Sequence, residues 1–114
     1  MKGYDWLSRR FKYAVDNSVV PAYMNHSISD EKSAFALECC RLVFEKDVAR
    51  LSQEVQDNPN FSQSTKSLLR KYSEKGRSLD WKDESVVKRF YEQTMTAKRI
   101  LGSKAKRESS YSTV

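Results

Sequence analysis

Apolar residues recur along the chain at intervals of three and four, which is the period of an amphipathic α-helix. The clearest apolar stripe runs through Leu37, Cys40, Phe44, Val48, Leu51 and Val55. It predicts a long second helix that begins near Ser27 or Ser29 and runs to about Gln56. In residues 34–44 the other faces are apolar as well, and a helix that is apolar all round is expected to be buried all round. We therefore predict that residues 34–44 form the centre of the core.

A shorter helix is predicted before it, over residues 4–15, because Leu7 and Phe11 share one apolar face with their neighbours. The opposite face carries Trp6 and Tyr13 among basic residues, so this helix is predicted to be contacted from two sides. Residues 16–29 are predicted to be an apolar connector that packs on the bundle or contacts a partner. In it, Pro21 disfavours helix at Val20 but suits the start of a short helix.

Two further helices are predicted in the second half of the chain. The third runs from about Ser62 to Lys75, with Gly76 as its C-cap, and the fourth from near Ser78 or Asp80 to Gly102. The last residues, 103–114, show no apolar period. The fold class is therefore all-α: a small four-helix bundle-like domain over residues 1–102, with a central buried second helix and a disordered basic, Ser-rich C-terminal tail over residues 103–114.

Charge is distributed unevenly along the chain. Of its 21 Lys and Arg and 15 Asp and Glu, 13 and 6 respectively lie in residues 59–114, so the net charge of +6 belongs to the second half. The basic residues are concentrated in the third helix, interrupted by acids at 80–84, and return in the tail. A basic surface attracts phosphate, anionic lipid or an acidic protein.

Candidate chemistry is sparse, and we predict that the protein is not an enzyme. His26 is the only histidine, so a nucleophile, a base and an orienting group do not converge. The two cysteines, Cys39 and Cys40, are adjacent and are expected to pack in the core, and with a single histidine they do not make a metal site. No cofactor is predicted. The absence of an apolar leader and of a membrane-length stretch favours a cytoplasmic protein, or a nuclear one in a eukaryote.

The leading functional prediction is a non-catalytic helical adaptor or regulatory protein that binds a larger protein partner carrying an acidic patch. Aromatic and arginine side chains are the usual anchors of such interfaces. The predicted contact residues are Trp6, Arg10, Tyr13, Lys66, Arg70 and Lys71. Packing of Trp6 against a neighbouring helix or a second copy of the chain, and hence a homodimer, remains an alternative. The C-terminal Tyr111–Val114 also has the pattern that carboxylate-binding PDZ grooves capture.

The second functional prediction is a nucleic-acid-binding protein in which Lys and Arg of residues 66–107 contact backbone phosphates. A helix-turn-helix around Gly76 is disfavoured, because the start of the following helix carries Asp80, Asp83 and Glu84, which would repel phosphates. Binding to a membrane surface through the first helix ranks third, since Asp5 and Asp16 lie within or beside it.

Overall fold

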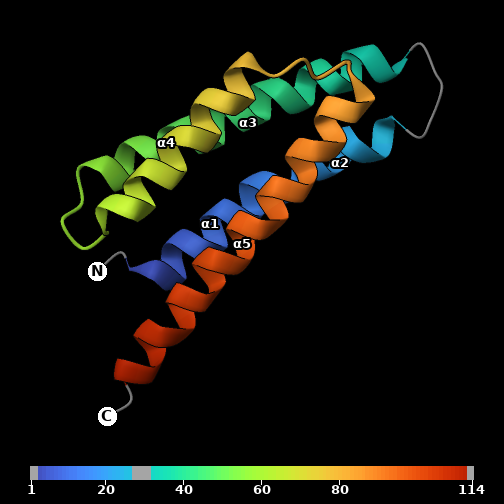
Figure 1. Ribbon diagram of the computed structural model, residues 1–114. Helices are drawn as coiled ribbons and strands as arrows, with labels where there is room; N and C mark the ends of the chain where they lie inside the picture. The colour runs from blue at the N-terminus through green and yellow to red at the C-terminus, as the bar shows by residue number, and fades with distance from the viewer. Residues whose placement is uncertain (1–2, 27–31, 113–114) are drawn as a thin grey trace.

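The computed structural model describes residues 3–26 and 32–112 of the chain, apart from the side chains of Lys32 and residues 109–112 (Figure 1). Every regular element in these ranges is an α-helix, which confirms the predicted all-α, bundle-like fold. The helices are α1 (Tyr4–Asp16), α2 (Val19–Asn25), α3 (Lys32–Gln56), α4 (Gln63–Ser78) and α5 (Glu84–Ser112). No helix in the described part of the chain is long and apolar enough to cross a membrane.

The helices form two antiparallel pairs. α4 packs along α3, and α5 runs back along α2 and α1 (Figure 1). α3 joins the pairs, because it contacts α1 and α2 as well as α4, so the predicted central position of the second helix is confirmed. The resulting molecule is elongated, measuring 54 × 23 × 19 Å along its principal axes.

Aromatic rings fill the centre of the core where the two pairs meet. The ring of Phe44 on α3 lies 5.4 Å from that of Phe90 on α5 and 5.7 Å from that of Trp81. The indole nitrogen of Trp81 donates a hydrogen bond of 2.9 Å to the carbonyl of Gly76, so this buried polar group is satisfied. Gly76 lies within α4, which continues to Ser78, and the prediction that it caps the helix is wrong.

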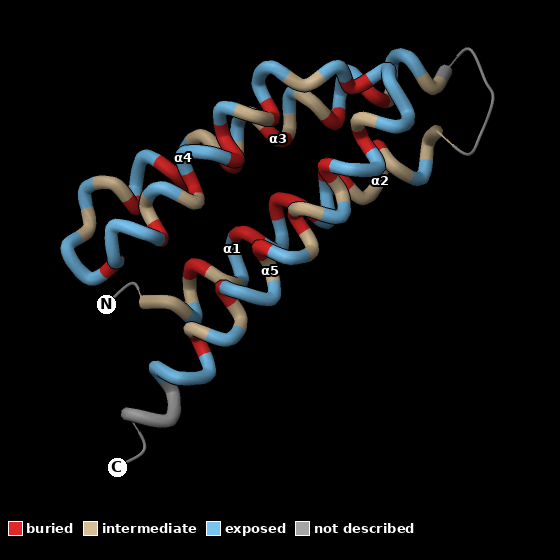
Figure 2. Tube along the Cα trace, in the orientation of Figure 1, coloured by how far each residue is buried: buried red, intermediate tan, exposed pale blue. Residues whose placement is uncertain are grey.

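The prediction that residues 34–44 are buried on every side is also wrong. Leu37, Cys40 and Phe44 are buried, but Phe35 is 76% exposed, Leu42 is 52% exposed and Cys39 is exposed. Figure 2 shows buried and exposed positions alternating along α3. The physical reason is the number of neighbours: α1 and α2 flank α3 on one side and α4 on the other, while no described helix covers its outer face. Phe35, Cys39 and Leu42 form what we call the outer stripe of α3.

The predicted connector contains the short helix α2. It begins at Val19, two residues before Pro21, although Pro21 was expected to disfavour helix at Val20. Proline is tolerated there because amides in the first turn have no acceptor within the helix. α2 buries Val19 and Ala22, and the imidazole Nε2 of His26 lies 2.9 Å from the carbonyl oxygen of Trp81. The predicted start of the second helix, at Ser27 or Ser29, lies outside the described residues.

The predicted end of the last helix at Gly102, and the disordered tail after it, are corrected over residues 103–108. α5 passes through Gly102 and continues to Ser112. Ala105 is buried, one turn after the buried Leu101, so the core-facing period continues beyond the predicted end. The Glu108 carboxylate accepts hydrogen bonds of 3.1 Å from the backbone N–H of Tyr4, at the start of α1. The last turns of α5 are therefore held against the start of α1. The spacing of apolar residues does not predict this contact, because it joins two distant segments through a helix terminus.

Candidate protein-binding site

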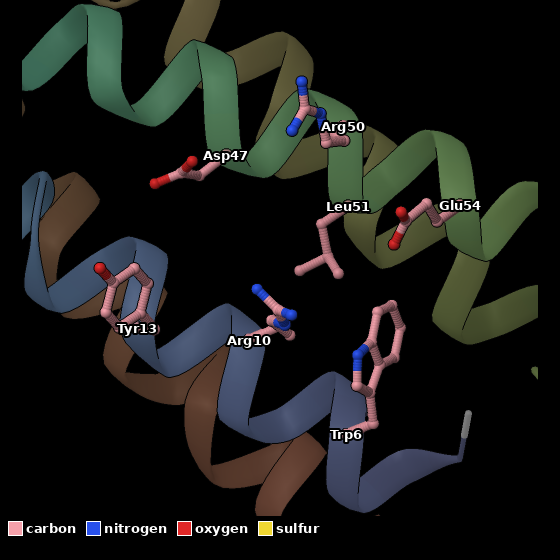
Figure 3. Close-up of a pocket in the computed structure, with 7 residues that line it drawn as sticks. All are labelled: Trp6, Arg10, Tyr13, Asp47, Arg50, Leu51 and Glu54. Atoms are coloured by element: carbon pink, nitrogen blue, oxygen red, sulfur yellow. The ribbon is translucent and has the colours of Figure 1, made fainter. Parts of the chain in front are cut away.

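A groove of about 250 Å³ lies between α1 and α3 (Figure 3). It is lined by Trp6, Arg10, Tyr13, Asp47, Arg50, Leu51 and Glu54. The α1 residues share this face because they are spaced four and three apart, while Leu7 and Phe11 turn into the core. The structure therefore brings together the three predicted contact residues of the first helix and places them opposite α3.

The apolar part of the groove comes from both helices. Leu51 is only 4% exposed and, in Figure 3, points from α3 toward α1, between Arg10 and Trp6. Trp6 is partly buried and packs against the core, whereas Tyr13 is 63% exposed. The groove thus combines a buried aliphatic floor with a partly buried tryptophan, and aromatic side chains in such packed surroundings are common anchors of protein interfaces.

The charged part of the groove carries both signs. Arg10 extends from α1 toward α3, and Arg50 lies on α3 between Asp47 and Glu54 (Figure 3). Within the described residues, neither the Arg10 nor the Arg50 side chain makes an ion pair or hydrogen bond, although neighbouring Arg9 lies 3.2 Å from the carboxylate of Asp5. Two guanidinium groups therefore remain able to bind carboxylates bidentately.

Of the three predicted contact residues on α4, Lys66, Arg70 and Lys71, the structure places only Arg70 in a groove beside α3. Arg70 lines a second groove, of about 390 Å³, between α3 and α4, and donates a hydrogen bond of 2.7 Å to Gln56. Arg50 lines both grooves, so Arg70 is separated from the α1–α3 groove only by α3. Lys66 and Lys71 line neither groove; the Lys71 ammonium lies 6.0 Å from the ring centroid of Tyr72.

Sequence reasoning missed the α3 side of the first groove. Asp47, Arg50 and Glu54 follow one another at steps of three and four along the flank of the predicted apolar stripe. That spacing places the three side chains on one face of a helix, and it is the sequence feature from which this charged face could have been predicted. Which helix would pack beside that face depends on the tertiary arrangement, which periodicity does not give.

The basic residues of the second half are spread over several faces. Lys75 donates to the side-chain oxygen of Gln93, and the Lys98 ammonium lies 3.0 Å from the Asp16 carboxylate. Arg99, Lys104 and Arg107 line a third groove, on α5. Among the residues that the structure describes, no three His, Cys, Asp or Glu side chains are grouped so that they could hold a metal ion.

Comparison with protein families, with curated proteins and with solved structures finds no match to this chain. The candidate site therefore stands on its own geometry.

Proposed function

We propose that this protein is a non-catalytic helical adaptor or regulatory protein that binds a larger protein partner in the groove between α1 and α3. The observation that supports this proposal is that Trp6, Arg10 and Tyr13 line one groove together with the buried side chain of Leu51. Tryptophan, tyrosine and arginine are enriched among the few residues that carry most of the binding energy at protein interfaces, and these residues cluster near the desolvated centre.

The chemistry of the groove describes the partner segment that would fit. An apolar side chain of the partner would pack on Leu51 and against the indole of Trp6. Carboxylates beside it would meet Arg10 and Arg50, whose side chains have no ion partner among the described residues. Asp47 and Glu54 would repel the carboxylates of the segment if it bound in the reverse orientation. They would therefore favour one orientation of the segment.

The test is affinity capture of the tagged protein from cells that express it, with quantitative mass spectrometry of the bound proteins. The Trp6→Ala, Arg10→Ala, Tyr13→Ala triple variant is expected to reduce recovery of the partner by about tenfold or more, since truncating each anchor costs about 1–2 kcal/mol. The matched control removes three exposed side chains from the outer face of α5, Lys88→Ala, Arg89→Ala and Glu92→Ala.

Circular dichroism must show that both triple variants keep the helical content of the wild type. The control is expected to retain the wild-type set of bound proteins. If the groove variant also retains that set, the α1–α3 groove is not the binding site and the proposal fails.

A further inference from the structure

The outward face of the second half of α5 forms a separate groove of about 350 Å³. It is lined by Thr96, Arg99, Ile100, Ser103, Lys104 and Arg107. Ala97, Leu101 and Ala105 are buried on the opposite side of the same turns, so this face is turned away from the core.

The charge of this α5 groove has one sign. The segment from Gln93 to Arg107 contains five basic residues and no acidic one. Asp16 pairs with Lys98, at 3.0 Å, whereas the Arg99 and Arg107 side chains make no ion pair within the described residues. Lys104 lies one turn from Arg107, with its ammonium 5.5 Å from the ring centroid of Tyr4. Like charges one turn apart repel, and a bound anionic group would relieve that repulsion.

An exposed aliphatic side chain lies between these cations. Ile100 is 40% exposed and lines the same groove as Arg99 and Lys104. Thr96 and Ser103 are short, so another side chain is able to approach Ile100 from outside. A nucleic-acid backbone offers phosphates to the cations but no aliphatic group to Ile100, whereas an acidic amphipathic helix supplies both carboxylates and an aliphatic side chain.

We infer that the α5 groove docks an acidic amphipathic helix of a partner protein. An aliphatic side chain of that helix packs on Ile100, and its carboxylates bind Arg99 and Arg107. These two positions are eight residues apart on α5, or about 12 Å along the axis, which two turns of a partner helix span. The inference uses none of the residues of the α1–α3 groove, so either site is able to exist without the other.

The experiment titrates the full-length protein into a fluorescent synthetic helical peptide at low salt. The peptide carries Glu residues along one face, one per turn, with a Leu between them; a second peptide has Gln in place of each Glu. The Arg99→Gln, Arg107→Gln variant is expected to weaken binding of the Glu peptide by about tenfold or more. Its matched control, Lys88→Gln, Arg89→Gln, removes the same charge from the first half of α5 and is expected to change the affinity by less than about twofold.

A variant of Ile100 distinguishes binding of an acidic helix from binding of other anions, because only the helix offers an aliphatic side chain to Ile100. Ile100→Ser is expected to weaken the Glu peptide by several fold while leaving binding to a DNA duplex or to phosphatidylserine vesicles unchanged. The inference is overturned if the Glu peptide does not bind saturably, if both charge variants weaken it equally, or if the duplex or the vesicles bind more tightly than the Glu peptide. The triple variant of Trp6, Arg10 and Tyr13 must still bind the Glu peptide, which keeps failure of this inference distinct from failure of the α1–α3 groove.

Discussion

The two helical pairs, α3 with α4 and α1 with α5, each contain a close contact between a side chain and a glycine. The contact is aromatic and buried in the first pair, and polar and exposed in the second. In each pair a side chain occupies the space that a Cβ atom would need at a glycine: Phe44 of α3 lies at Gly76 of α4, and Glu108 of α5 lies at Gly3, the residue before α1. A Cβ on Gly76 would lie 2.0 Å from the ring of Phe44, and a Cβ on Gly3 would lie 2.3 Å from the carboxylate of Glu108. None of the described glycines has a positive φ, so these two are required for space and not for backbone conformation.

The difference lies in what each side chain is able to do if it is displaced. Phe44 is fully buried among the rings of Trp81 and Phe90 and has nowhere to move. Glu108 is exposed and holds the first turn of α1 through hydrogen bonds to the backbone N–H of Tyr4. One contact is a packing constraint in a dense interior, and the other is a helix cap made by a flexible group in water. The absence of a Cβ at Gly76 and at Gly3 therefore permits two contacts that differ in strength.

Breaking the buried contact is expected to have the largest effect. Gly76→Ala forces the Phe44 ring out of its position, and we expect a loss of about 3 kcal/mol in the free energy of unfolding. Denaturant unfolding followed by circular dichroism measures this. A double-mutant cycle with Phe44→Leu tests the cause: Gly76→Ala should cost much less in that background. A cost below about 0.5 kcal/mol in the wild-type background would contradict the packing explanation.

Breaking the exposed contact is expected to cost less. Glu108→Ala removes the cap of α1, and we expect a loss of about 0.5–1 kcal/mol. Glu92→Ala, which removes the same charge from an exposed position of α5, is the control and should be nearly neutral. Gly3→Ala should destabilise the wild type but not the Glu108→Ala variant, because the clash then disappears. The same unfolding assay compares these four variants, the double variant included, with the wild type, and equal costs of Gly3→Ala in both backgrounds would rule out this contact.

The smallest effect is expected from lowering the pH, which distinguishes a charged helix cap at the start of α5 from a neutral one at the start of α4. Hydrogen bonds from the Ser85 hydroxyl and from the backbone N–H groups of Val86 and Ser85 hold the pKa of Asp83, before α5, below its usual range. Because the folded state favours the carboxylate, its stabilisation is present above the usual Asp pKa of about 3.9 and is lost as pH falls through the lowered value. The start of α4 is capped by the neutral Ser62, whose hydroxyl accepts from the Thr65 N–H.

Melting temperatures of Asp83→Asn and Ser62→Ala, measured between neutral pH and pH ~2.5, test this difference. Asp83→Asn is expected to lower the melting temperature by less than Glu108→Ala does. Its difference from the wild type is expected to shrink toward zero as the pH falls. The destabilisation by Ser62→Ala is expected to stay constant over the same range. If the Asp83→Asn difference does not narrow in acid, its carboxylate charge does not stabilise α5.

The buried stripe of α3 was predictable because it depends only on helical period. Leu37, Phe44 and Val48 follow the 3.6-residue repeat and all are buried. Phe35 and Leu42 were not predictable in the same way, because an apolar residue on a helix becomes buried only where another element covers it. Composition gives the number of apolar side chains but not the number of neighbouring helices.

The candidate site was half predictable for a similar reason. Trp6, Arg10 and Tyr13 belong to one face of one helix, and local spacing places them together. Arg50 and Leu51 join them only because α3 packs beside α1, which is a tertiary fact. The C-terminal turns of α5 illustrate the same limit, since Glu108 meets Tyr4 across 104 positions of sequence.

The adjacent cysteines of α3 have a practical consequence for studying this protein. Side chains of successive helical residues point about 100° apart, so Cys39 lies on the outer stripe of α3 while Cys40 is buried. Burial raises the pKa of the Cys40 thiol, which suppresses the reactive thiolate at neutral pH. A maleimide dye would therefore label Cys39 selectively, without any engineered residue. A fluorophore at that position would sit on α3 about 12 Å along the axis from Asp47, close enough to report occupancy of the α1–α3 groove in solution.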